Sequence, residues 1–276
     1  AHCTASTSAS TPPAAAPVDA LGDGAPDAAQ QAAHDSLDKL RRALSEQEAA
    51  HGPMDPTTLC AVAELAHELQ SQGKLGEAEP IMRRALEERE AALGAMHADT
   101  LTSAHDLGWL LVLRGKVADA EAPLVRAVEG REATLGALHA DTLSSIHNLG
   151  WFYLAQCKPD EAEPLVRRAM EGREATLSAD HADVFASIAA VADLLQLQGK
   201  SDDAEPLLLQ ALKGREATLG LLHRDTLESV NNYANYLNAA GKQDDAMLLY
   251  HRALEGMEAT LGALHHDTLT CASNLS

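Results

Sequence analysis

Residues 97–116 read HADTLTSAHDLGWLLVLRGK, and residues 139–158 read HADTLSSIHNLGWFYLAQCK. The two stretches lie 42 residues apart and carry the chain's two tryptophans, Trp109 and Trp151, at one shared position. Steps of 42 residues from Leu59, with no insertion or deletion, reach Leu101, Leu143, Phe185, Leu227 and Leu269. Self-similarity at a fixed period of this length is typical of stacked supersecondary units.

Each 42-residue unit carries the pattern of two helices. Apolar residues fall at i, i+3, i+4 and i+7 in the first segment, as in Ile146, Leu149, Gly150 and Tyr153, which predicts a helix rather than a strand. A residue suited to a left-handed helix end closes this segment: Gly73, Gly115, Gly199 and Gly241, with Cys157 as the exception. A second helix is predicted to follow and to end at Leu-Gly in four of five units.

The motif His-x-Asp-Thr separates the units. Its aspartates stand in the first turn of the next helix, where the helix dipole favours negative charge, and in the first unit Asp55-Pro56 reads as an N-cap followed by a first-turn proline. The motif therefore predicts helix capping. Recurrence alone does not make its histidines catalytic candidates: His97, His139, His181, His223 and His265.

The repeat sets the expected domain organisation. Residues 1–33 are rich in Ala, Ser, Thr and Pro and are predicted to be a disordered leader. The repeat region, residues 34–276, divides into a half repeat at 34–54, five repeats at 55–96, 97–138, 139–180, 181–222 and 223–264, and a truncated repeat at 265–276. The truncated repeat either caps the fifth repeat or begins a further one, and we expect the array to continue.

Residue spacing within the unit points to a family. The tetratricopeptide spacing is followed by Leu107-Gly108, Ala120, Leu124 and Ala127. Three longer motifs recur through residues 55–276, and more faintly through 34–52: LG-x-x-H-x-D-T-L, G-K-x-x-E-A-E-P-L and R-A-L-x-x-R-E-A-T-L-G. With residues 231–234, Asn-Asn-Tyr-Ala, these units resemble the 42-residue tetratricopeptide repeats of kinesin light chain and nephrocystin-3. The resemblance implies an all-α fold, a right-handed superhelical solenoid of antiparallel helix pairs whose first helices line a concave groove.

Composition excludes several classes of partner. With 21 Lys and Arg against 41 Asp and Glu, the formal net charge is -20, which disfavours nucleic acid and anionic membranes. The four cysteines have no metal-like spacing and predict neither a zinc site nor a disulfide framework, which fits a reducing, cytoplasmic location. No apolar run approaches the roughly 20 residues of a membrane helix. We expect a monomer without cofactor or metal.

The candidate site lies on the first helices. Counted from Leu101 and its equivalents, positions 5, 9 and 12 line the groove in tetratricopeptide families, and the candidates there are His105, Trp109, His147, Trp151, Asn231, Asn235 and Asn238. Tryptophan is a frequent interface anchor, and asparagine can hydrogen-bond a peptide backbone through donor and acceptor. Two alternatives stay open: the tryptophans pack between repeats, and the asparagines are solvated. His105 and His147 without a carboxylate or cysteine make a weak metal site.

The chain departs from kinesin light chains in charge. Those proteins use basic groove residues to take acidic cargo peptides that contain tryptophan, whereas no Lys or Arg stands at positions 5, 9 or 12 here. Arginines recur instead on the second helices, where we expect surface ion pairs with neighbouring glutamates. The heptads that would bind a kinesin heavy chain are missing from residues 1–54.

Catalytic motifs such as G-x-S-x-G, H-E-x-x-H and G-x-G-x-x-G are absent from the sequence, so we expect no enzyme. The first hypothesis is a non-catalytic protein interaction scaffold that binds a peptide segment of a partner in its groove, as a kinesin-light-chain-like cargo adaptor would. The alternative is the regulatory or sensor arm of a larger signalling enzyme, an ATPase or protease. A third possibility is self-association through the incomplete last repeat.

Overall fold

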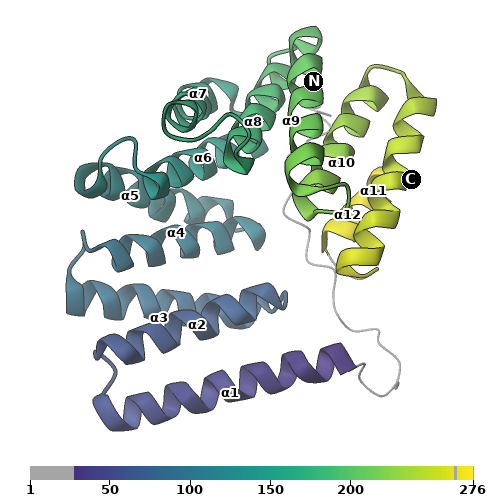
Figure 1. The fold of residues 1–276 in the computed structure, drawn as a ribbon. Helices are drawn as coiled ribbons and strands as arrows, with labels where there is room; N and C mark the ends of the chain where they lie inside the picture. Colours follow the sequence, from purple (N-terminus) through teal and green to yellow (C-terminus); the bar gives the residue numbers. More distant parts are fainter. Residues whose placement is uncertain (1–27, 264–265, 276) are drawn as a thin grey trace. The chain divides into compact units, whose positions relative to one another are not determined.

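The computed structural model describes residues 28–263 and 266–275, which form α-helices joined by short turns. The first helices of five pairs are α2 (Pro56–Ser71), α4 (Ala98–Leu113), α6 (Ala140–Ala155), α8 (Ala182–Leu197) and α10 (Arg224–Ala239). Their second helices are α3 (Leu75–Leu93), α5 (Val117–Leu135), α7 (Pro159–Thr176), α9 (Ser201–Leu219) and α11 (Gln243–Leu261). Helix α1 (Ala28–His51) precedes the pairs, and α12 (His266–Leu275) follows them (Figure 1).

The packing divides the described residues into two compact units. The N-terminal unit contains α1 to α5 and ends at Gly136, and the C-terminal unit begins at Ala137 and contains α6 to α12. In each unit a first helix packs against its own second helix, and that second helix packs against the next first helix. The fold is therefore the all-α solenoid of helix pairs that the sequence predicts.

Helix α1 extends further than expected. It begins at Ala28, six residues before the predicted half repeat, so the end of the predicted leader is helical. The added residues, AAQQAA, are good helix formers, which explains why the helix begins before the predicted half repeat. The rest of the predicted leader lies outside the described residues.

The histidines of His-x-Asp-Thr cap the first helices. In His139 the side-chain Nδ1 accepts a hydrogen bond of 3.2 Å from the backbone N–H of Asp141. His97, His181 and His223 make the same contact with Asp99, Asp183 and Asp225. Because the imidazole supplies the acceptor that serine or aspartate supplies elsewhere, the recurrence of histidine has a structural cause.

The predicted glycine stops also form. After α4, Gly115 has a φ of 69°, and the N–H of Lys116 reaches the carbonyl of Leu111 at 2.9 Å. Cys157 occupies this position after α6 and has a φ of 56°, which makes it the one non-glycine residue with positive φ in the described chain. A side chain is strained there, because its Cβ crowds the following carbonyl.

Replacing Cys157 with glycine is therefore expected to raise the free energy of unfolding by about 0.5–1 kcal/mol, as strain relief of about 1–2 kcal/mol outweighs the greater chain entropy of glycine. Urea unfolding of the two proteins measures the change. The matched control is Gly115→Cys, which introduces the same strain after α4 and is expected to be destabilising. A stabilising effect of Gly115→Cys would contradict this account.

Small residues allow the paired helices to approach closely. The alanines that recur in the second helices are almost fully buried: Ala78, Ala85, Ala120, Ala127, Ala162, Ala169, Ala204, Ala211, Ala246 and Ala253. Glycine allows a closer approach still, because a Cβ on Gly130 would lie 2.3 Å from Cδ2 of Leu101. The same contact joins Gly172 to Leu143, Gly214 to Phe185 and Gly256 to Leu227.

One series of recurrent arginines is internal, which corrects the expectation of surface ion pairs. Arg89, Arg173 and Arg215 are 5–8% exposed. In each case Nη1 donates to the hydroxyl of a serine in the next first helix at 2.8 Å and to a carbonyl in the first turn of that helix: Ser103 and Asp99, Ser187 and Asp183, Ser229 and Asp225. Arg126 does form the predicted kind of pair, with Glu90 at 2.8 Å.

Candidate functional site

The N-terminal unit places His105 and Trp109 on α4, where both side chains are partly exposed. Beside them, Nε2 of His67 on α2 lies 3.1 Å from Oδ2 of Asp106 on α4. The hydrogen bond to Asp106 raises the pKa of His67 above its usual value. His67 stands at position 9 of α2, counted from Leu59, whereas Asp106 stands one residue after position 5 and was not among the positions expected from sequence.

The C-terminal unit places His147 on α6, partly exposed, with its Nδ1 buried and without a hydrogen-bond partner. Burial, together with the charges of Arg173 and Arg215, lowers the pKa of this imidazole to about 3. The side chain is therefore neutral at physiological pH, which suits contact with an uncharged group and not an ion pair.

This shift predicts that acid destabilises the C-terminal unit. The unfolded chain protonates His147 below about pH 6.5, whereas the folded chain resists protonation until about pH 3, so stability falls as pH drops between these values. Because the ring is partly exposed, water screens part of the effect, and we expect a loss of about 1 kcal/mol between pH 7 and 5. In urea unfolding, His147→Asn should remove that loss.

The control for this experiment is His251→Asn on α11, because His251 is exposed. Its pH dependence should equal that of the wild type. Equal pH dependence of the wild type and His147→Asn would contradict the account.

The asparagines of α10 are placed differently from one another. Asn231 and Asn235 are 9% and 3% exposed, and Asn238 is exposed. Oδ1 of Asn231 accepts from Nδ2 of Asn274 on α12 at 3.1 Å, and Oδ1 of Asn235 accepts from the hydroxyl of Tyr250 on α11 at 2.6 Å. Two of the three amide oxygens proposed to hold a peptide backbone thus already join α10 to its neighbours.

Trp151 on α6 is partly exposed, like Trp109 on α4. The predicted groove positions differ in exposure from one helix to the next. At position 12, Val112 and Leu154 are 2% and 1% exposed, and Leu154 fills a core cluster with Ala162 of α7 and Leu194 of α8. The exposed or partly exposed residues of α2, α4 and α6 include positions 2, 6, 9 and 13: Cys60, Glu64, His67, Ser71, Thr102, Asp106, Trp109, Leu113, Ser144, Asn148, Trp151 and Ala155.

We call positions 2, 6, 9 and 13 of the first helices the first-helix face. In α8 and α10 this face is more buried, with Ala190, Asn232 and Asn235 at 6% exposure or less. Sequence alone could not show that the apolar residues at position 12, Val112 and Leu154, are buried. Leu154 is covered by the following repeat, and a contact between repeats leaves no mark in the sequence of one helix.

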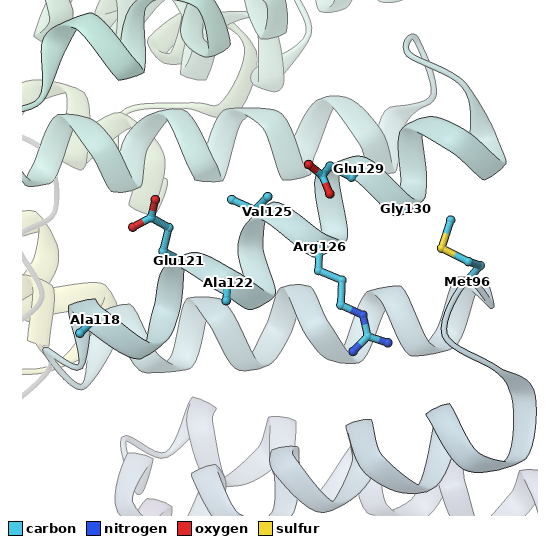
Figure 2. Close-up of a pocket in the computed structure, with 8 residues that line it drawn as sticks. All are labelled: Met96, Ala118, Glu121, Ala122, Val125, Arg126, Glu129 and Gly130. Carbon is cyan, nitrogen blue, oxygen red and sulfur yellow. The ribbon is translucent and has the colours of Figure 1, made fainter.

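An open hollow of about 690 Å³ lies on α5 and the turn before α4, away from the predicted site residues. Figure 2 shows Glu121, Val125, Arg126 and Glu129 projecting from α5, with Met96 at one end. Arg126 is engaged by Glu90 and by the carbonyl of Ala95 at 3.3 Å, and no serine, cysteine or histidine lines the hollow.

The part of the chain that the structure describes holds no group of three or more His, Cys, Asp or Glu arranged to bind a metal ion. His105 and His147, the pair considered from sequence, belong to different units. None of the helices in residues 28–263 and 266–275 combines the length and the apolar character needed to cross a bilayer.

Comparison with known proteins agrees with this architecture. Tetratricopeptide repeat families match residues 57–133 and 183–259, and residues 142–183. No curated protein sequence matches the chain. Among solved structures, the nearly identical TPR-like repeats of a protein described as a kinesin light chain of Podosopora anserina are 27% identical, with a TM-score of 0.58, over 75% of this chain and 98% of that one.

A variant of the same Podosopora protein is 26% identical, with a TM-score of 0.59, over 74% of this chain and 96% of that one. BtubC (BKLC) from P. vanneervenii is 18% identical over 86% of this chain and 94% of its own, and its TM-score of 0.61 supports the fold alone. The helix pairs, their small-residue contacts and these matches lead to one conclusion: the chain belongs to the tetratricopeptide repeat family and is similar to its kinesin-light-chain type.

Proposed function

We propose that this chain is a non-catalytic scaffold that binds a peptide segment of a partner protein on the first-helix face of its units, as a kinesin-light-chain-like cargo adaptor would. Tetratricopeptide repeats generally mediate interactions between proteins. The observation that carries the proposal is the placement of Trp109 and Trp151. Both occupy position 9 of their first helix, and both remain partly exposed although smaller apolar residues fill the core around them.

Tryptophan at this position is specific to α4 and α6. The equivalent residues of α2, α8 and α10 are His67, Asp193 and Asn235, so packing of the repeat does not require an indole there. A partly exposed indole gains by burying its remaining surface against a partner, and tryptophan is enriched among the residues that dominate binding energy. We therefore assign Trp109 as an anchor within the N-terminal unit and Trp151, separately, as an anchor within the C-terminal unit; His105 and His147 lie one helical turn before them.

Charge indicates the class of peptide. Positions 2, 6, 9 and 13 of α2, α4, α6, α8 and α10 include no Lys or Arg, whereas the exposed or partly exposed acids Glu64, Asp106 and Glu228 stand among them. Acidic groups on a binding face favour partners of opposite charge through steering and complementarity. A peptide with an apolar side chain for the indoles and with lysine or arginine beside it fits this face better than the acidic peptides that kinesin light chains take.

Peptide selection against the intact chain tests the proposal. We expect enrichment of basic, apolar-containing peptides over selection against an unrelated solenoid. For an enriched peptide, Trp109→Ala or Trp151→Ala should weaken binding by about 30-fold, which corresponds to about 2 kcal/mol. Met96→Ala, in the hollow of Figure 2, is the control and should leave the affinity unchanged. No enrichment, or unchanged affinity in both tryptophan variants, would refute the proposal.

A further inference from the structure

An ion pair joins two neighbouring first helices of the N-terminal unit. Nε2 of His67, at position 9 of α2, lies 3.1 Å from Oδ2 of Asp106, at position 6 of α4. Both residues belong to the first-helix face, and their side chains are 55% and 20% exposed, so a bound peptide can reach them. Trp109 follows Asp106 by three residues on α4 and therefore lies beside it on the helix surface. The pair thus borders the assigned anchor.

The repeat architecture does not require this pair. Where position 9 of one first helix precedes position 6 of the next, the later repeats combine residues that cannot form it: Trp109 with Asn148, Trp151 with Ala190, and Asp193 with Asn232. An exposed pair of this kind also contributes little to stability. A carboxylate with an ionisable partner at this one place is better explained by recognition of a ligand than by packing of the repeat.

The charge of His67 depends on groups from three helices. The hydrogen bond to Asp106 of α4 has the largest effect and raises the pKa of His67, whereas burial and the charge of Arg89 on α3 lower it. No charged group among the described residues of α1, which also packs on α2, acts on the ring. On α2 itself, Glu64 stands one turn before His67 and is exposed. Protonation of His67 is therefore tied to Asp106 above all.

We propose that Asp106 binds a lysine or arginine side chain of the partner peptide, and that His67 competes with that side chain for the same carboxylate. This inference rests on the proposed function, because it names the group that recognises the basic residue beside the apolar side chain at Trp109. A protonated His67 pairs with the carboxylate and offsets its charge. A neutral His67 leaves Asp106 its full negative charge, so a peptide cation can displace the imidazole.

The spacing of Asp106 and Trp109 suits a short peptide motif. Residues three apart on a helix have about 5–6 Å between their Cβ atoms. In an extended peptide, side chains two residues apart lie on the same side, about 6–7 Å from each other. A basic residue two places from an apolar residue can therefore contact Asp106 and Trp109 together. Because arginine can engage both oxygens of a carboxylate, we expect arginine to bind better than lysine.

The competition makes peptide binding by the N-terminal unit depend on pH. At one pH unit below the pKa of His67, only about one tenth of the molecules carry a neutral imidazole, and the apparent affinity falls about tenfold. The pKa of His67 is raised above 6.5, so this loss is expected by about pH 5.5. The C-terminal unit has Asn148 three residues before Trp151, and binding there should lack this dependence.

Titration of the whole chain with the peptide acetyl-Arg-Ala-Leu-amide tests the inference, with binding followed by NMR of the Trp109 indole N–H. Trp151→Phe assigns that signal. We expect a dissociation constant about tenfold higher at about pH 5.5 than at about pH 8. His67→Gln should bind equally tightly at both pH values, because a glutamine amide cannot gain a charge. Asp106→Asn should bind about tenfold more weakly than the wild type at the higher pH, without pH dependence.

His51→Gln is the matched control, because His51 is an exposed histidine in the last turn of α1. This variant should keep the affinity and the pH dependence of the wild type. A second readout needs no peptide. In Asp106→Asn, NMR of the His67 ring should show a pKa below 6.5, since burial and the charge of Arg89 still oppose protonation.

The outcomes separate this inference from the proposed function. Equal wild-type affinities at the two pH values, no binding of the tripeptide at the higher pH, or a pKa of His67 that Asp106→Asn leaves unchanged would each overturn the inference. The scaffold proposal would survive all three results if selected peptides without basic residues still required Trp109 or Trp151. If no selected peptide required either tryptophan, the scaffold proposal would fail, and the tripeptide titration would still decide the role of Asp106.

Discussion

Replacing Arg173 with alanine is expected to lower the free energy of unfolding by about 3 kcal/mol. The guanidinium is 5% exposed, and burial lowers its pKa, with partial compensation from the charge of Asp183. Its hydrogen bonds to the carbonyl of Asp183 and the hydroxyl of Ser187 join α7 to α8. Alanine leaves the buried hydroxyl of Ser187 and the carbonyl of Asp183 without this donor and removes the packing of the long side chain, which together account for the estimate.

In the last helix pair, two less polar residues already replace the arginine and the serine that it contacts. The last pair has Met257 where the earlier pairs have arginine, and Cys271 stands 14 residues later in place of serine. Both residues are buried, at 3% and 1% exposure, and burial raises the pKa of the Cys271 thiol to about 11, so the thiol is neutral. The double variant Arg173→Met/Ser187→Cys should therefore recover most of the stability that Arg173→Ala loses, since an apolar pair can replace a buried polar one.

Arg167→Ala on the same helix provides the control. Arg167 pairs with Glu163 at 2.8 Å on the surface, with 44% of its side chain exposed. Such pairs contribute about 0–1 kcal/mol. Chemical denaturation of the four proteins measures all effects on one scale. Similar losses in Arg167→Ala and Arg173→Ala would mean that the buried contacts of Arg173 do not stabilise the fold.

A methyl group at residue 214 is expected to cost about 2 kcal/mol. In Gly214→Ala the new Cβ would lie 2.1 Å from Cε1 and 2.2 Å from Cζ of Phe185, a rigid ring that cannot yield by rotating one terminal group. Overpacking of this kind costs about 1–3 kcal/mol and exceeds the roughly 0.5–1 kcal/mol that alanine gains over glycine in a helix. The midpoint of urea unfolding should fall accordingly.

Two further variants separate overpacking from helix propensity. Gly76→Ala lies in α3, where a Cβ meets nothing within 4 Å, and should be neutral or stabilising. Adding Phe185→Leu to Gly214→Ala should restore part of the loss, because Leu59 packs opposite Glu88 without glycine. A stabilising Gly214→Ala substitution would show that α8 and α9 approach less closely than described.

Local features of the fold could be predicted from sequence. The 42-residue period follows directly from the recurrence of residues in the sequence. The helix caps and the glycine stops depend on residues within one or two turns of each helix end; the caps precede α4, α6, α8 and α10. The hydrogen-bond partners of the recurrent arginines could not be predicted from such local residues. Arg89 has glutamates beside it in sequence, but its acceptors Asp99 and Ser103 lie on the next helix. Only the packing of one helix pair on the next decides which partner it takes.

The candidate site was less predictable for the same reason. Helical periodicity places Trp109 and Trp151 on one face, and both are partly exposed there. It does not show that Leu154 is covered by α8, or that Asn235 is held by Tyr250 of α11. The first contact depends on how one helix pair packs on the next, and the second depends on how the two helices of one pair approach each other. Sequence therefore proposes the tryptophans as binding residues but does not show which of their neighbours are buried.

The accessibility of the two indoles tests the central claim most directly. Trp109→Phe leaves Trp151 as the only tryptophan, and Trp151→Phe leaves Trp109, so each variant reports on one unit. Acrylamide quenching of each should be measured without and with a selected basic, apolar-containing peptide. The account predicts red-shifted, readily quenched emission that becomes blue-shifted and protected on binding. Blue-shifted, protected emission that the peptide leaves unchanged would contradict it, and would assign both tryptophans to packing between repeats.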